Sequence, residues 1–131
     1  CAPVPRQVPL PVWFSGTLTA RNVCRITELG DGGIPIMGTD AAGLADGVRV
    51  LRAAFAAAGR DAATLGVRAA LATVRDAGGR ADVDRTLAAA PDLLLAGATD
   101  VHVSLRAFDP SGERPADTFA RLVARYRAET A

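Results

Sequence analysis

Lysine is absent from this sequence: all 15 basic residues are arginines, and they are scattered along the chain. The formal net charge is only +1. A protein that binds the phosphate backbone of a nucleic acid needs a basic patch, so this charge balance argues against a nucleic-acid partner. Because alanine is also abundant, the preference for arginine is typical of a biased genomic composition rather than of a particular chemistry.

Long apolar runs and cysteines are scarce as well. No stretch approaches the ~20 apolar residues that span a bilayer, and no signal peptide is visible, so we expect no membrane partner and a cytoplasmic location. The two cysteines, Cys1 and Cys24, have no partners at metal spacing, which excludes a disulfide framework and predicts no metal site. Cys24 falls within a helical pattern, which predicts a buried thiol.

The common catalytic signatures are also missing. The glycines do not have Walker or dinucleotide-binding spacing, and no serine stands in a nucleophile-elbow context. No catalytic residue can therefore be assigned. If the protein is an enzyme, cofactor chemistry is the natural hypothesis, because a cofactor would carry the reaction and the protein would hold it.

The 131 residues, half of them hydrophobic, are enough for one domain with a core. Residues 1–10, CAPVPRQVPL, contain three prolines and are predicted to be an extended linker before a domain at residues 11–131. A cysteine at position 1 and a proline-rich beginning are what we expect of the middle of a longer chain.

From residue 11 a unit of strand, turn and amphipathic helix occurs four times. Strands are predicted at residues 12–16, 33–37, 65–73 and 100–108. Helices are predicted at about residues 18–29, around 44–55 and closed by Gly59, at about 82–96 with a break near Pro91, and from Pro115 onward. Pro35 within the second strand implies an edge, a bulge or an irregular end.

Strict alternation of strand and helix predicts an α/β fold with a parallel sheet. Two architectures satisfy it: a small doubly wound sheet, or half of a TIM (β/α)₈ barrel, which takes ~250 residues in full. The core-facing residues predicted for the first and last helices are Leu18, Val23, Ile26, Leu29, Phe119, Leu122, Val123 and Tyr126.

Two turns between strand and helix could hold an anion. The first contains Ser15, Gly16 and Thr17, and the second Gly38, Thr39 and Asp40. A helix N-terminus offers unpaired N–H groups and a positive dipole end, which suits a phosphate. Threonine and aspartate also cap helices for stability alone, and both interpretations remain open.

The fourth predicted strand alternates, with Val101, Val103 and Leu105 on one side and His102, Ser104 and Arg106 on the other. His102 has no visible acid or metal partner, so we expect a hydrogen-bonded core histidine. Arg106, and less strongly Arg68 on the third strand, could face a ligand; a solvated or salt-bridged arginine is the alternative for both.

The order of these motifs resembles the luciferase-like family of flavin- and deazaflavin-dependent oxidoreductases and monooxygenases. PVWFSGTLTARNVCRITELGDGGIPIM resembles the family's P-[IV]-W-[IV]-G-G segment, its Ala- and Arg-rich helix and its L-[AG]-D-G-W-I-P run. FAAAGRDAATLGV and LLLAGATDVHVSL are similar to later motifs, so that the resemblance spans residues 8–131 in order. Ser15-Gly16 stands for the family's Gly-Gly pair, and Gly33 for its aromatic residue.

The resemblance implies that the chain is the C-terminal half of a TIM barrel, strands five to eight. FMN or coenzyme F-420 would bind at the carboxyl ends of the strands. By analogy the cofactor-binding residues would be Ser15, Gly16, Thr17, Met37, Gly38 and Thr39. Arg68 and Arg106 would be substrate-binding, and the catalytic residues would lie largely in the other half.

A half-barrel exposes two unpaired strand edges, which is an aggregation hazard unless they are covered. We therefore expect a homo-oligomer, an N-terminal half-barrel partner, or a larger enzyme of which this is a fragment. The ligands implied are a flavin-type cofactor and a small-molecule substrate. The alternative function is a non-catalytic half-barrel module that binds a phosphate ligand or a partner.

Overall fold

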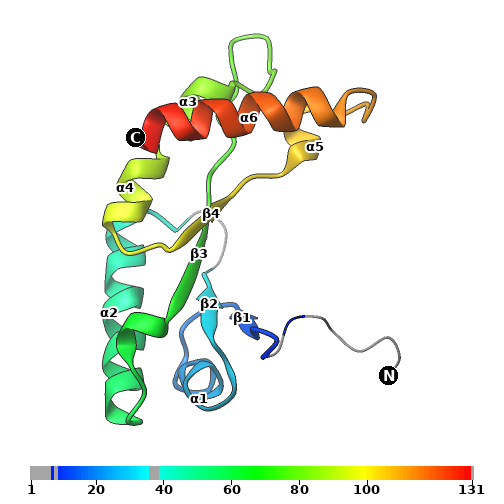
Figure 1. Cartoon of the computed structure of the whole chain (residues 1–131). Helices are drawn as coiled ribbons and strands as arrows, with labels where there is room; N and C mark the ends of the chain where they lie inside the picture. Colours follow the sequence, from blue (N-terminus) through cyan, green and yellow to red (C-terminus); the bar gives the residue numbers. More distant parts are fainter. Residues whose placement is uncertain (1–6, 8, 36–38, 131) are drawn as a thin grey trace.

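Four short strands form one parallel sheet in which each strand pairs with its neighbours in the chain (Figure 1). The computed structural model describes residues 7, 9–35 and 39–130. The strands are β1 (Trp13–Ser15), β2 (Gly32–Ile34), β3 (Gly66–Ala70) and β4 (Asp100–His102). Their order in the sheet is β1-β2-β3-β4, and all three pairings are parallel. The predicted α/β class and parallel sheet are confirmed.

Helices follow each of the four strands. They are α1 (Ala20–Leu29), α2 (Ala41–Ala57), α3 (Val83–Leu87), α4 (Ala90–Leu95), α5 (Leu105–Phe108) and α6 (Pro115–Thr130), with a 3₁₀ turn η1 (Ala62–Thr64) before β3. Three helices have a side-chain cap at their N-terminus, from Thr19, Asp40 and Asp82. These residue types accept hydrogen bonds from N–H groups of the first turn, which explains where the helices begin.

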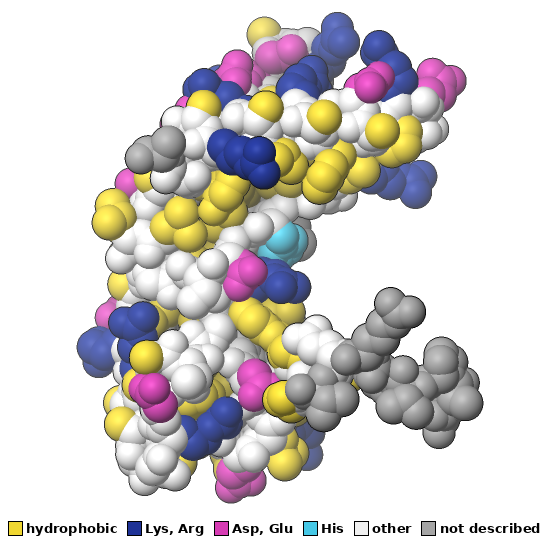
Figure 2. Space-filling view, in the orientation of Figure 1, with side chains coloured by type: hydrophobic (Ala, Val, Ile, Leu, Met, Phe, Trp, Pro, Cys, Tyr) yellow, Lys and Arg dark blue, Asp and Glu magenta, His cyan; other side chains and the backbone are white. Residues whose placement is uncertain are grey.

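One face of the sheet is covered and the other is open. The register aligns Phe14 with Gly33 and Gly33 with Val67, and this face packs against the helices. The opposite face carries Trp13 and His102, and Figure 2 shows it as a recess with the histidine inside. The helices contact one another in a row along the covered face, α1 to α2, α2 to α4 and α4 to α6.

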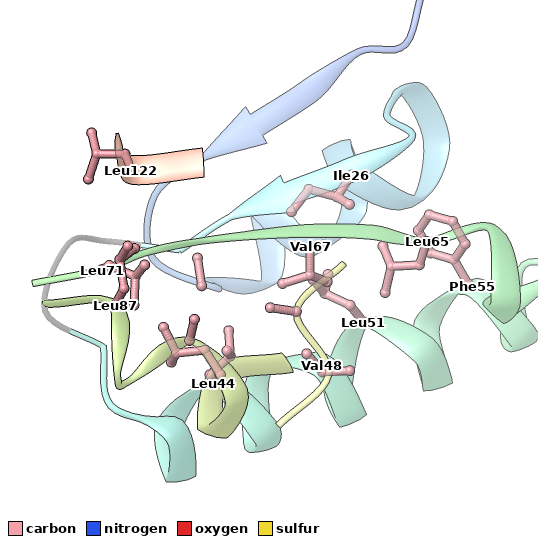
Figure 3. Close-up of a cluster of buried hydrophobic side chains, with 14 of the residues drawn as sticks. Ile26, Leu44, Val48, Leu51, Phe55, Leu65, Val67, Leu71, Leu87 and Leu122 are labelled. Atoms are coloured by element: carbon pink, nitrogen blue, oxygen red, sulfur yellow. The ribbon is translucent and has the colours of Figure 1, made fainter. Parts of the chain in front are cut away.

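The core lies between the covered face and the helices (Figure 3). On α2, apolar side chains recur every three or four residues and turn one stripe toward Val67 of the sheet. The buried residues of that stripe are Leu44, Val48, Leu51 and Phe55, which are the four that the sequence predicts. Phe55 is among the largest fully buried side chains of the described residues, and it lies beside Leu65 at one end of the core (Figure 3).

Prolines mark three boundaries, and the sequence predicts those at Pro91 and Pro115; the predicted second strand runs through Pro35 to Met37, but residues 36 and 37 lie outside the described residues. β2 ends at Ile34, directly before Pro35. The third helical stretch is interrupted at residues 88–89, and Pro91 lies in the first turn of α4. The last helix begins at Pro115. A proline in a first turn loses no helical hydrogen bond, whereas one inside a strand or helix removes a donor, so each proline sits at an end.

The fourth strand is much shorter than predicted. β4 ends at His102, and the segment from Leu105 forms helix α5 with Ser104 at the N-cap position. The expectation that Arg106 lies on this strand is therefore wrong. The apolar–polar alternation continues into a Leu-Arg-Ala sequence, whose members favour helices, after a serine that favours caps. The third strand is also shorter than predicted, and ends at Ala70.

The first helix turns a slightly different stripe inward than predicted. Val23, Ile26 and Thr27 face the core, and Gly30 continues the same row. Leu29 falls outside this row and is 67% exposed, so its assignment to the core was wrong. Cys24 also lies outside it, and its thiol is exposed rather than buried.

Glu28, one helical turn further on, raises the pKa of the Cys24 thiol above its ordinary value, mainly through side-chain hydrogen bonding, with smaller contributions from desolvation and from the carboxylate charge. Only the thiolate is alkylated. In a Cys1→Ser background, Glu28→Gln should therefore lower the pKa and speed the reaction of Cys24 with iodoacetamide at pH 7.5. The rate is measured from pH 7 to 10. Identical pH profiles for the two proteins would show that Glu28 does not control this thiol.

Phe119 of α6 is 61% exposed, although the sequence assigns it to the core face. Leu122 on the same face is buried, and Val123 and Tyr126 are half-buried. The apolar face is therefore where the sequence predicts it, but the described residues cover only part of it. No helix in the described ranges is long and apolar enough to cross a membrane.

Candidate functional site

The conformation of the turn between β1 and α1 is fixed by one glycine and one asparagine. Gly16 has φ +116°, a conformation that L side chains rarely adopt, and its N–H donates to Ile34 O at 3.1 Å. The Asn22 amide donates from Nδ2 to Thr17 O at 3.0 Å and to Ser15 O at 3.4 Å. The carbonyl groups of the turn are thereby drawn toward α1, and the Thr17 side chain is exposed.

The N-terminus of α1 that follows has the character of an anion site. Thr19 caps it with a neutral hydroxyl, which accepts from Asn22 N at 3.3 Å. No acidic residue stands in the first turn, and Arg21 lies there. Among the described residues, the N–H groups of Ala20 and Arg21 have no recorded acceptor. Unpaired donors and a positive dipole end together favour a bound phosphate.

The turn between β2 and α2 differs in charge. Asp40 caps α2, and its Oδ1 accepts from Gly43 N at 2.8 Å. A carboxylate in this position already neutralises the helix dipole and repels a second anion. Thr39 is half-buried beside it, whereas the predicted cofactor contacts Met37 and Gly38 lie outside the described residues. Electrostatics therefore favours the first turn over the second.

A cavity of about 330 Å³ lies between α1, α2 and the carboxyl ends of β1 and β2. Gly16, Thr17 and Thr39 border it, so the structure brings together the described parts of both predicted turns. The rest of its wall is mostly apolar and comes from Leu18, Ile34 and the buried face of α2. It can accept an apolar group beside the two turns.

The open face of the sheet begins with a flat aromatic surface. The Trp13 ring lies over the backbones of Gly32 on β2, the neighbouring strand, and Gly66 on β3, the strand beyond it. A Cβ on Gly32 would come within 2.7 Å of Trp13 Cε3, and one on Gly66 within 2.5 Å of Trp13 Cζ2. Real Cβ atoms are never found so close to a ring. Both glycines are therefore required by the tryptophan.

Arg68 lies next to this ring on the same face. Its Cζ is 4.9 Å from the centroid of the Trp13 ring, and its Nη2 is 3.9 Å from Asp100 Oδ1. The side chain is 43% exposed and forms no recorded hydrogen bond with any described residue. The guanidinium group is thus positioned by stacking and by a long ion pair, with donors available to a ligand.

His102 and Arg106, which the sequence places on the same side of the fourth strand, lie on different elements. Arg106 is exposed on α5. His102 is exposed on the open face, so the expectation of a hydrogen-bonded core histidine is wrong: in this part of the chain nothing packs over that side of β4. Nor does any group of three or more metal-ligating side chains occur among the described residues.

Several structurally important residues escape the sequence analysis. The hydrogen bonds of the Asn22 amide have no signature in the sequence, because their acceptors are backbone carbonyls of the preceding turn. The Trp13 contact had a partial signal, since glycines at the starts of two strands often mark a close approach. Arg60 donates from Nη1 to Gly30 O at 2.6 Å and to Thr27 O at 2.8 Å, across a gap in sequence that no periodicity reveals.

No protein-family model matches the chain, and no curated protein or solved structure is significantly similar to it. The function is therefore argued from the geometry of the site and from the motifs in the sequence.

Proposed function

We propose that the chain is the C-terminal half of a TIM barrel and supplies the phosphate-binding turns of a luciferase-like oxidoreductase that uses FMN or coenzyme F-420. Two features of the sheet support the barrel over the doubly wound alternative. The strand order never reverses, whereas a doubly wound sheet turns back at its switch point. All helices in contact with the sheet pack on one face, as in a barrel wall.

The observation that carries the cofactor proposal is the turn between β1 and α1. Three features of this turn fit the phosphate of either cofactor: the conformation of Gly16, the Asn22 hydrogen bonds to the turn carbonyls, and a helix N-terminus without an acidic residue. Ser15, Gly16 and Thr17 would hold that phosphate, and Thr39 would border the adjoining cavity. The predicted contacts of Met37 and Gly38 belong to the same proposal.

Arg68 would contact the substrate from the open face, since its guanidinium has donors free of protein acceptors among the described residues. Arg106 would approach from α5, after the carboxyl end of β4. A bound flavin or deazaflavin would supply hydride transfer, which no side chain provides by itself. The catalytic residues are expected on the partner half, and the complete enzyme is expected to act in the cytoplasm on a small molecule.

The test is a fluorescence titration of the protein with FMN and, separately, with coenzyme F-420. Arg21→Glu places an acid in the first turn of α1 and reverses one charge there. We expect it to weaken binding about tenfold, because two charge steps at a helix end are worth roughly 1–2 kcal/mol. Arg52→Glu, on the exposed face of α2, is the control with the same change of charge, and should bind like the unaltered protein.

The outcomes are distinct. Saturable binding that Arg21→Glu weakens and Arg52→Glu leaves unchanged supports the assignment of the turn. Equal effects of the two variants would point to a general charge effect, and lack of binding to both cofactors at high micromolar concentration would contradict the proposed function.

A second candidate is a module that binds a phosphate ligand without catalysis. The feature that favours it is that every residue of the proposed phosphate turn belongs to this chain, whereas its sequence offers no convincing acid–base pair. This module would bind inorganic phosphate with the same dependence on Arg21, and would show neither FMN nor F-420 binding.

A further inference from the structure

Both outer edges of the sheet lack a neighbouring strand within the described ranges. β1 pairs only with β2, and β4 pairs only with β3. Backbone groups that face such an edge require another partner, or remain in water and attract other strands. Among the described residues, the outward backbone groups of β1 and β4 are therefore open to pairing with another strand.

The groups that face each edge follow from the alternation of a parallel strand. On β1, Gly16 N and Val12 O bond toward β2, so the N–H and C=O groups of Trp13 and Ser15 face outward. On β4, His102 O accepts from Leu71 N of the β3 side, so the N–H and C=O groups of Val101 face outward.

These two edges are complementary to each other. If β1 of a second copy lies parallel to β4, the outward groups of Val101 meet those of Trp13 and Ser15, and each donor faces an acceptor. Side chains must also keep to their faces, since a slip of one residue would turn the apolar set outward. A register that places Phe14 opposite Val101 or Val103 satisfies this condition, because all three lie on the helix-covered face.

Apolar side chains beside the edges fit the same arrangement. Next to β4, a groove of about 480 Å³ runs between the strand and α6, with Phe119 exposed on its wall. Before β1, Leu10 and Val12 are exposed. Leu10 and Val12 are four and two residues from Phe14, so in an extended strand their side chains lie on the same face as Phe14. If the β1 strand of the second copy extends toward residue 10 beside β4, both side chains point to the covered face, where the groove lies. Figure 2 shows apolar atoms gathered beneath α6.

We infer that, when no amino-terminal half-barrel covers these edges, a second copy of this chain occupies them, and that two copies close an eight-stranded parallel barrel around a two-fold axis. Four strands in sequential order are half of such a barrel. Charge permits the enclosure, because each open face pairs Arg68 with Asp100 and adds no net charge to a shared interior. The inference rests on the half-barrel arrangement proposed above but not on the identity of the cofactor.

Size-exclusion chromatography with light scattering tests the inference on the full chain. We expect a mass of twice 13.5 kDa. Val101→Pro removes the outward N–H while sparing the bonds to β3, and should shift the protein to a monomer with an unchanged far-UV spectrum. Val101→Ala keeps that N–H and should remain dimeric.

A second pair of variants addresses the groove, and decides the question if Val101→Pro fails to fold. Phe119→Ser should weaken the dimer at least tenfold, whereas Leu95→Ser should leave it unchanged, although Leu95 is 86% exposed. A monomeric wild-type chain, open-ended larger assemblies, or a dimer indifferent to both Val101→Pro and Phe119→Ser would overturn the inference. A dimer that binds neither FMN nor F-420 would refute the proposed function alone.

Discussion

Replacement of Gly66 by alanine is expected to lower the free energy of unfolding by about 2 kcal/mol, because the new Cβ would overlap the Trp13 ring. The direction of the effect is diagnostic. A glycine-to-alanine change at an unstrained position stabilises by ~0.4–1 kcal/mol through the unfolded chain. The measurement is urea denaturation followed by circular dichroism, and the emission of the single tryptophan should shift to longer wavelength as the ring leaves its seat.

The control is a variant in which the Trp13 ring, and with it the overlap at position 66, is removed. In a Trp13→Leu background the ring is gone, so Gly66→Ala should cost much less than in the wild type, and the double-mutant cycle should show a coupling of at least ~1 kcal/mol. Gly78→Ala, in the exposed loop before α3, should change stability by under ~0.5 kcal/mol. A neutral or stabilising effect of Gly66→Ala would contradict the close contact between the Trp13 ring and the backbone of Gly66.

Arg60→Ala should destabilise the protein by about 2–4 kcal/mol. The Nη1 group of Arg60 donates to Thr27 O and Gly30 O at the end of α1, and Cζ lies 4.2 Å from the centroid of the Phe55 ring. Hydrogen bonds from a charged donor and a half-buried cation–π contact are each worth more than an exposed ion pair. The Nη2 group of Arg60 is also 3.7 Å from Asp31 Oδ1, and only 31% of the Arg60 side chain is exposed.

Two variants show whether the guanidinium itself is needed. Arg60→Lys keeps the charge but loses the fork that reaches several carbonyl groups, and should retain less than half of the stabilisation. Arg52→Ala removes an exposed arginine of α2 that has no recorded partner among the described residues, and should change stability by under ~0.5 kcal/mol. Equal losses for Arg60→Ala and Arg52→Ala would mean that Arg60 does not join α1 to α2.

Local signals were enough to predict much of this fold. The spacing of Leu44, Val48, Leu51 and Phe55 identifies both the helix and its buried face, because a 3.6-residue period is specific to a helix. Pro115 identifies a helix start for an equally local reason. For the candidate site, Gly16 carries the signal of a turn, and a turn is found there.

What could not be predicted depends on neighbours that are distant in sequence. Arg106 follows a perfect alternation, yet the strand ends early because no further strand holds that segment and helix formers follow a serine. Leu29 is outside the core because α2 contacts a stripe through Ile26 and Thr27 instead. The charge difference between the two turns required the structure, since only the observed cap of Asp40 places its carboxylate at the end of α2.

The position of Trp13 also has a kinetic consequence. Its ring joins the first strand to the third across the second, so the contact closes a long segment of chain and forms only when three strands are aligned. Contacts of this kind form later than local helices such as α2. During refolding, the helical signal should therefore appear first, and the fluorescence of the single tryptophan should follow the step at which the sheet acquires its register.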